Sequence, residues 1–208
     1  MYFSKKLSIF SNVKHCFFSK NGGVSKNIYD SLNCGLGSKD NKKNILDNLS
    51  IVSKKIGINE DNLFLMNQTH SNKVVIIDES NKKIQRIDAD ALITKIKNIA
   101  ISVLTADCVP ILIYEKKENI VACIHAGWRG AINGIVENTL SQIIKMSKNN
   151  NIYVAIGPCI GSKNYEVGRE FYNEFCRKDK INEKFFSLVN NDKFLFDLRK
   201  YINFKIAK

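Results

Sequence analysis

The sequence predicts an α+β fold in which mixed β-sheets pack against flanking helices. Two observations carry this prediction: short runs rich in β-branched apolar residues recur along the chain, and other segments have apolar residues at helical spacing. With 208 residues, 44% hydrophobic and 25% charged, the composition is that of an ordinary globular protein. We therefore expect residues 1–208 to form one domain.

The N-terminal part predicts a loop followed by a helix. Residues 21–37 contain four Gly and three Asn, a composition that favours turns or a binding loop over a packed element. In the segment 41–56, apolar residues recur at steps of three and four, and Gly57 follows directly. This spacing predicts an amphipathic helix that ends before Gly57.

The strands are expected further along the chain. Six runs rich in β-branched residues predict them, at 74–77, 91–94, 99–104, 109–114, 120–125 and 152–156. Several of these runs are apolar at nearly every position, which predicts that both faces of their sheet are covered. Apolar stripes at 131–146 and 165–177 predict two helices for that cover.

The charge pattern does not indicate a nucleic-acid partner. Lys and Arg number 32 and Asp and Glu 20, for a net charge of +12, but the lysines occur as scattered pairs instead of one tract. We therefore expect a solvated basic surface, which can attract small anionic substrates. The N-terminus has neither a signal-peptide core nor a membrane span, so a cytoplasmic protein with reduced cysteines is expected. The sequence does not specify an oligomeric state.

Two histidines and one cysteine are candidate metal ligands. His70 lies just before the run at 74–77, His125 ends the run at 120–125 beside two glycines, and Cys108 follows the run at 99–104. Two imidazoles and a thiolate can bind zinc and leave a fourth position open. From spacing alone, a buried core cysteine and surface histidines remain the alternative, because only the fold can bring the three together.

Six motifs spread over the chain resemble those of the YfiH-like family, also called the laccase-domain or polyphenol-oxidase-like family. They are NQTHSNKVV (67–75), DADALIT (88–94), TADCVPIL (105–112), HAGWRGAINGIVENTL (125–140), AIGPCIGSKNYEVG (155–168) and DLR (197–199). Their order and spacing fit the family as well. The resemblance implies a YfiH-like fold.

The resemblance also implies a function. Members are cytoplasmic purine nucleoside phosphorylases that act on adenosine, inosine and methylthioadenosine with phosphate, and they also deaminate adenosine. The family's metal ligands fall on His70, Cys108 and His125, with zinc as the expected metal and copper as the alternative. The older family label keeps a copper-dependent polyphenol oxidase in view.

Three residues are candidates for the chemistry beside the metal. Arg129 is expected to bind phosphate, Asp107 to shuttle a proton during catalysis, and Trp128 to stack on a purine. Each has a structural alternative: a salt bridge for Arg129, a turn for Asp107 and a packing anchor for Trp128.

Two glycine-containing segments are expected to line the substrate cleft. They supply Gly22, Gly23 and Ser25 from the first loop, and Gly157 and Pro158 after the last strand. Asp90 and Gln68 are expected to orient the histidine ligands.

Two other classes of function use the same residues. Cys108 as nucleophile and His125 as base would make a metal-free amide hydrolase. A catalytically inactive binding protein is the third class, because family members usually continue through another helix and a closing strand, whereas this sequence stops at Lys208. We expect the chain to be truncated relative to the family, without that C-terminal helix and strand.

Overall fold

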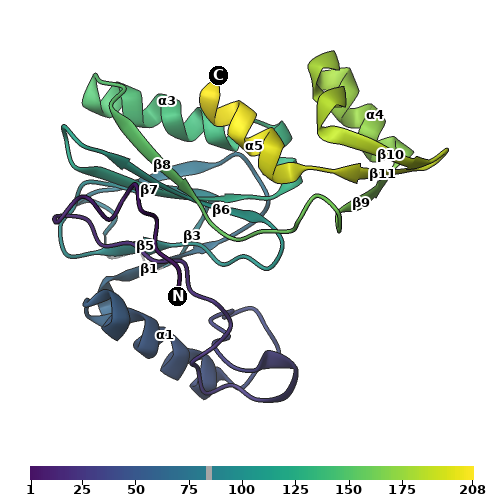
Figure 1. Ribbon diagram of the computed structural model, residues 1–208. Helices are drawn as coiled ribbons and strands as arrows, with labels where there is room; N and C mark the ends of the chain where they lie inside the picture. The colour runs from purple at the N-terminus through teal and green to yellow at the C-terminus, as the bar shows by residue number, and fades with distance from the viewer. Residues whose placement is uncertain (83–85) are drawn as a thin grey trace.

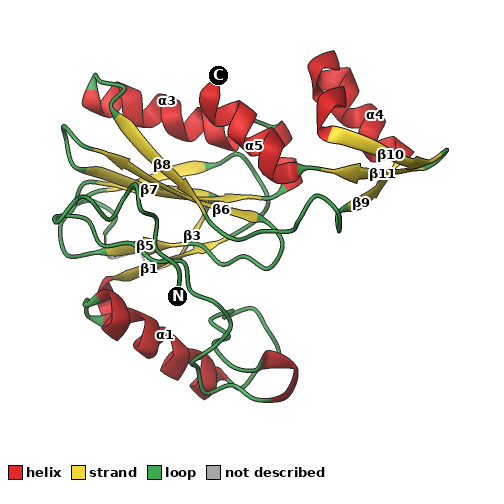
Figure 2. Ribbon diagram, in the orientation of Figure 1, coloured by secondary structure: helices red, strands yellow, loops and turns green. Residues whose placement is uncertain are grey.

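The computed structural model describes residues 1–82 and 86–208 (Figure 1). The described residues form three β-sheets with helices packed beside them, which confirms the predicted α+β class with mixed sheets and flanking helices (Figure 2). Among these residues, no helix combines the length and the apolar character that crossing a membrane requires.

The central sheet has five strands in the order β2-β4-β7-β6-β8. Their bounds are β2 (Val74–Ile77), β4 (Ala91–Thr94), β7 (Ile120–Ala126), β6 (Val109–Glu115) and β8 (Ile152–Ile156). β2 and β4 run parallel, and the other neighbours are antiparallel. Each strand coincides with a predicted run to within one residue, so these five predictions are confirmed.

Helices cover one face of the central sheet. α3 (Ile135–Ser147) and α5 (Leu198–Ala207) lie above it in Figure 1. Ile111 and Ile124 of the sheet and Ile143 of α3 are fully buried in one hydrophobic core. Burying several such side chains, each worth about 1.5–3 kcal/mol, fixes the helices on the sheet.

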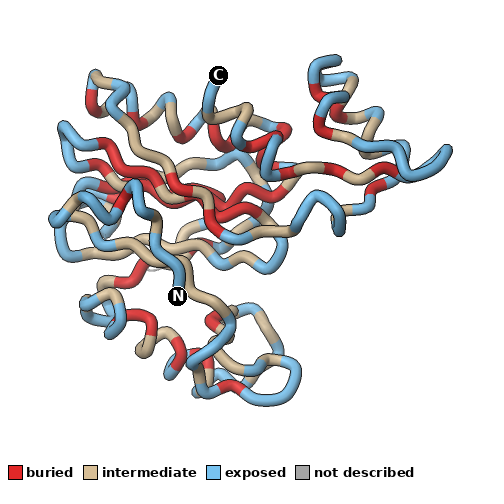
Figure 3. The backbone as a smooth tube through the Cα atoms, viewed as in Figure 1, coloured by how far each residue is buried: buried red, intermediate tan, exposed pale blue. Residues whose placement is uncertain are grey.

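A second, parallel sheet covers the other face. Its order is β3-β1-β5, with bounds β3 (Arg86–Asp88), β1 (Leu63–Asn67) and β5 (Ala100–Ser102). Phe64 of β1 packs with Leu92 and Cys123 of the central sheet in a separate buried cluster. The central strands are therefore covered on both faces, as their continuous apolar runs predicted, and Figure 3 shows buried backbone concentrated along them.

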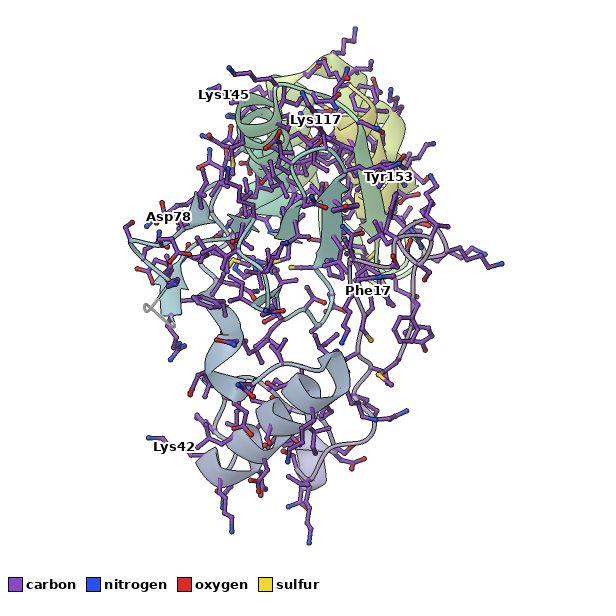
Figure 4. The ribbon with its side chains drawn as sticks, turned by 90° about the vertical axis from the view of Figure 1, so that its left-hand side faces the viewer. Phe17, Lys42, Asp78, Lys117, Lys145 and Tyr153 are labelled. Atoms are coloured by element: carbon purple, nitrogen blue, oxygen red, sulfur yellow. The ribbon has the colours of Figure 1, made fainter. Side chains whose placement is uncertain are left out.

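The N-terminal region packs around these two sheets. α1 (Lys42–Ile56) begins after Asn41, whose side chain accepts a hydrogen bond from the Lys43 N–H, and it ends at the left-handed Gly57. This confirms the helix predicted at 41–56. Phe17 and Tyr153 both pack against the buried cluster of Leu7, Tyr114 and Ala155, and Figure 4 shows the two side chains on the same side of the molecule. A short 3-10 helix η2 (Glu60–Asn62) leads into β1, and η1 (Asn27–Tyr29) lies in the first loop.

A third sheet projects from the C-terminal side of the molecule. Its elements are β9 (Glu166–Gly168), α4 (Arg169–Lys178), the 3-10 helix η3 (Lys180–Phe185), β10 (Phe186–Asn190) and β11 (Lys193–Phe196). Its strands are antiparallel in the order β10-β11-β9. Aromatic contacts join it to the main core, with Phe175 against Tyr201 of α5 and Phe171 against Trp128.

Two helix predictions need correction. The helix predicted at 165–177 begins only at Arg169, because Val167 pairs with Phe194 and makes the preceding residues a strand. The segment predicted as one helix at 131–146 is two helices, α2 (Trp128–Ile132) and α3, separated at Gly134 with its φ of 87°.

Candidate metal centre

The three predicted metal ligands come from different parts of the chain and meet at one end of the central sheet. His125 lies near the end of β7, Cys108 directly precedes β6, and His70 lies in the loop between β1 and β2. Because β6 and β7 are antiparallel, with Pro110 paired to His125, the start of one strand and the end of the other lie side by side. The sheet register thus explains how Cys108 reaches His125.

The ligand atoms of His70, Cys108 and His125 all lie within 4.8 Å of one another. Sγ of Cys108 is 3.8 Å from Nε2 of His70, and the two imidazole rings meet edge to face with centroids 4.7 Å apart. The donor set of two nitrogens and one sulfur fits zinc or copper chemically. The role of the three residues as metal ligands stays a prediction.

The cluster has a protected side and an open side. His125 is buried, Cys108 is half-buried and His70 is exposed. Catalytic metal sites differ from structural ones in keeping a position accessible to water or substrate. The exposure of His70 is consistent with that kind of site.

Asp90 sets the electrostatics of the buried side. It directly precedes β4 and is fully buried, and its Oδ1 accepts a hydrogen bond from Nδ1 of His125 at 2.8 Å. Burial raises the pKa of Asp90, but hydrogen bonds from His125 and Ser71 lower it more, so the pKa lies well below its usual value. Asp90 is therefore a carboxylate at neutral pH.

The two imidazoles have opposite pKa shifts. Burial lowers the pKa of His125, but Asp90 and the neighbouring Cys108 thiol outweigh it and raise the pKa to about 9. Burial and the nearby His125 lower the pKa of His70 from its usual value. His70 is thus the neutral imidazole of the pair.

Gly127 is a residue of the centre that the sequence reasoning did not single out. A Cβ atom at this position would lie 2.7 Å from Cδ2 of His70 and 3.0 Å from Sγ of Cys108. Only glycine lets the backbone pass so close to both side chains. Its position in the HAGWRG motif was the available signal.

Arg129 and Trp128 lie beside the centre on α2. Arg129 is exposed and belongs to none of the ion pairs among the described residues. Its guanidinium lies 5.1 Å from the centroid of the Trp128 ring, which also packs on Phe171 at 4.8 Å. Arg129 and Phe171 therefore already contact the Trp128 ring, on which a purine would have to stack.

A backbone hydrogen bond joins Asp107 to the segment after β8, and the predicted role of Gly157 and Pro158 in lining a substrate cleft stays a prediction. Asp107 is exposed, and its backbone carbonyl accepts a hydrogen bond from the Ile160 N–H at 3.0 Å. Gly157 is buried with its N–H on the Pro110 carbonyl, and Pro158 is exposed. Burial raises the pKa of Tyr165, and the nearby Cys108 and Asp107 raise it further, to about 12. Tyr165 therefore lies close enough to the site to interact electrostatically with these two residues, and sequence reasoning missed it.

The first loop is ordered by its own polar contacts. Gly22 is exposed, with a φ of 93°. Gly23 donates its N–H to Oγ of Ser31, and Ser25 is buried with its hydroxyl donating to Asp40 at 2.6 Å. The Ser25 hydroxyl therefore holds the loop together, and its predicted role in lining a substrate cleft stays a prediction.

Gln68 does not contact either histidine ligand through a hydrogen bond in the described structure. Its amide instead donates to the Leu104 carbonyl at 2.7 Å and accepts from the Leu104 N–H at 2.8 Å. Gln68 therefore ties the loop of His70 to the segment that precedes Cys108.

A family model described as multi-copper polyphenol oxidoreductase laccase matches residues 14–208. Among curated relatives, purine nucleoside phosphorylase RC0672 of Rickettsia conorii is 34% identical over 194 residues, which cover 90% of this chain and 80% of the relative. The adenosine deaminase RL5 of an unknown prokaryotic organism is 33% identical over 159 residues, covering 72% of this chain and 60% of that protein.

Solved structures show the same fold. The Neisseria meningitidis protein NMB0706 superposes with a TM-score of 0.80 at 32% identity, covering 90% of this chain and 75% of that one. The Bacillus licheniformis hypothetical protein YfiH superposes with a TM-score of 0.84 at 25% identity, covering 90% and 74%. Both structures match the mixed sheets and flanking helices described above.

Proposed function

The chain belongs to the multi-copper polyphenol oxidoreductase laccase family, and from this premise we propose that it is a metal-dependent purine nucleoside phosphorylase that also deaminates adenosine. The names of its relatives support this class of reaction. The observation that carries the proposal is the convergence of His70, Cys108 and His125 within 4.8 Å, with one side exposed. The proposed substrates are adenosine, inosine and methylthioadenosine, together with phosphate.

His70, Cys108 and His125 would hold the metal, with zinc as the first choice and copper as the second. Two nitrogens and one sulfur suit both ions. When bound, the metal supplies a Lewis acid that stabilises negative charge. Asp90 holds Nδ1 of His125, which leaves Nε2 of the ring for coordination.

The surrounding residues have separate tasks in phosphorolysis. A phosphate oxygen attacks the anomeric carbon of the ribose, and the bond from that carbon to the base breaks, so that its electron pair leaves with the base. Arg129, exposed and without a carboxylate partner among the described residues, would bind and orient the phosphate. Asp107, exposed next to Cys108, would transfer the proton that the departing base or amine takes up.

The test is a product analysis of the purified protein with adenosine. With phosphate present, we expect adenine and ribose 1-phosphate, and without phosphate we expect inosine and ammonia. Both reactions should stop after chelation, and both should be absent in a Cys108→Ala variant. The control is Cys34→Ala, which removes a buried thiol outside the site and should leave both reactions intact. Failure of the metal-loaded protein to cleave or deaminate any of the three nucleosides would overturn the proposal.

A second candidate function rests on the order of three side chains. Cys108, His125 and Asp90 stand in the relation of nucleophile, base and orienting carboxylate, which is the arrangement of a cysteine hydrolase acting on an amide. Metal distinguishes the two functions, because a hydrolase of this type keeps full activity after chelation. The family description also keeps a copper-dependent polyphenol oxidase as an alternative, for which copper-loaded protein would have to consume oxygen with a phenol.

A further inference from the structure

We propose that Asp90 is a positioning residue that couples the two histidine ligands, because one carboxylate holds the backbone of His70 and the ring of His125 at the same time. This inference rests on the metal site of the proposed function. It goes beyond the expected orientation of single ligands, since it makes the geometry of both imidazoles depend on one buried group.

The first half of the argument is the loop that carries His70. The N–H groups of Thr69, His70 and Ser71 all donate to the Asp90 carboxylate, at 3.3, 3.0 and 2.7 Å. The hydroxyls of Thr69 and Ser71 donate to it as well. Successive N–H groups that surround an anion form a nest, and here the anion is the protein's own side chain.

The loop needs this anion because of its backbone conformation. His70 has a φ of 58°, in the left-handed region that residues with a side chain rarely adopt. A strained conformation persists only where surrounding contacts determine it. The hydrogen bonds to Asp90 are such contacts, and Asn72 adds another by donating to the Asn133 carbonyl at the end of α2.

The second half of the argument is the ring of His125. Its Nδ1 donates to Oδ1 of Asp90 at 2.8 Å, and the same oxygen accepts the His70 N–H at 3.0 Å. The backbone carbonyl of Asp90 also accepts the His125 N–H at 2.8 Å, across the β4–β7 pairing. Asp90 therefore ties the two ligands together from a buried position directly before β4, with no solvent access to relax the arrangement.

The experiment compares Asp90→Asn with a matched variant at the far end of β4, the strand that directly follows Asp90. Asparagine keeps the size but replaces one carboxylate oxygen with an N–H₂ group. Depending on how the amide is turned, that group faces either the donors of Thr69 and Ser71 or the donors of His70 and His125, so one of the two sets loses its acceptor. Thr94→Val at the other end of β4 also removes a buried hydrogen bond, from Oγ1 to the Ile77 carbonyl at 2.9 Å, but lies away from the ligands.

The probes are Zn²⁺, titrated in competition with a chromophoric chelator, and Co²⁺, followed by its visible absorption. For Asp90→Asn we expect a loss of Zn²⁺ affinity of about 10- to 100-fold and a changed cobalt spectrum. Thr94→Val should keep wild-type values in both measurements. Wild-type Zn²⁺ affinity and an unchanged cobalt spectrum in Asp90→Asn would overturn the inference.

Two further arms keep the inference testable. If Asp90→Asn does not fold, Ser71→Ala removes a single hydroxyl donor to Asp90, and we expect a smaller loss of Zn²⁺ affinity, whereas no change would overturn the coupling. Because these measurements need no nucleoside, an inactive wild-type protein with normal metal binding would refute the proposed phosphorylase and leave the coupling standing. A wild-type protein that binds neither metal would refute both.

Discussion

Asp90 and Asn48 are both fully buried polar side chains, and each holds a loop near the sequence motifs that predicted function. Asn48 lies on α1, where its Oδ1 accepts the Val24 N–H at 2.8 Å and its Nδ2 donates to Ser25 and to the Asn33 carbonyl. Asp90 only accepts, and among its donors is the ring of His125. Both residues therefore hold a loop from a buried position, Asn48 through donated and accepted hydrogen bonds and Asp90 through accepted ones alone.

The difference between them is charge. A carboxylate can surround itself with donors, so Asp90 gathers three consecutive N–H groups and an imidazole and changes the proton affinity of that imidazole. An amide has to match donors with acceptors, so Asn48 fixes loop shape without adding charge. From this comparison we expect substitution of Asn48 to lower the free energy of unfolding, and substitutions near Asp90 to lower the affinity for metal.

The largest expected effect is on stability, in Asn48→Ala. The substitution leaves the Val24 N–H and the Asn33 carbonyl without their partner, and we expect the free energy of unfolding to fall by about 3 kcal/mol. Urea unfolding followed by circular dichroism measures it. Asn44→Ala is the control on the same helix, because Asn44 makes no side-chain hydrogen bond among the described residues. If Asn48→Ala also lowered Zn²⁺ affinity, the distinction between a structural Asn48 and a ligand-positioning Asp90 would be contradicted.

For Gly127→Ala we expect a smaller loss of stability than for Asn48→Ala, but, unlike that variant, a loss of Zn²⁺ affinity. The added methyl group would crowd His70 and Cys108, and overpacking of this kind costs about 1–3 kcal/mol. We expect Zn²⁺ affinity to fall by at least about tenfold, because the crowded atoms belong to the proposed ligands. Gly168→Ala is the control, since a Cβ there meets nothing within 4 Å. Equal Zn²⁺ affinity in both variants would contradict the assignment of the centre.

The central sheet could be predicted from the sequence because its strands are continuous apolar runs. β4 and β7 are buried on both faces, which leaves few polar positions to confuse the pattern. The short strands β3 and β9 have three residues each and acquire their strand character from a partner far along the chain. No local pattern can reveal such a partner.

The candidate site was partly predictable for the same reason. Cys108 and His125 lie at the ends of strands and His70 in the loop between β1 and β2, which are places where functional residues concentrate, and the family motifs include all three. Their convergence depends on the β6–β7 register and on the hydrogen bonds of Asp90 to a loop about twenty residues away. The shared role of Asp90 is a property of three-dimensional packing, and spacing alone does not contain it.

The smallest expected effect is the response of the first loop to acid. The carboxylate of Asp40 accepts hydrogen bonds from Ser25 and Asn33, and the hydrogen bond from Ser25 is the main reason why the pKa of Asp40 lies below its usual value. A carboxyl group with a lowered folded pKa contributes stability above its unfolded pKa, which is about 3.9, and loses it as the pH falls through the folded pKa. Asp40 should therefore stabilise the loop at neutral pH and stop doing so in acid.

The measurement is hydrogen-exchange protection of the amides of residues 23–33, expressed relative to the intrinsic exchange rate at each pH. Protection in the wild type should be constant from pH 7 to about pH 4 and fall below it, whereas Asp40→Asn should show lower protection at neutral pH and little further change in acid. Asp47→Asn, a change of an exposed carboxyl on α1, serves as the control and should follow the wild type. Because Asn48 is neutral, we expect the acid response of this loop to come from the Asp40 carboxylate that accepts the Ser25 hydroxyl. An unchanged response in Asp40→Asn would mean that another carboxyl group, such as Asp30 in the loop itself, is responsible and that the contrast with Asp90 is too simple.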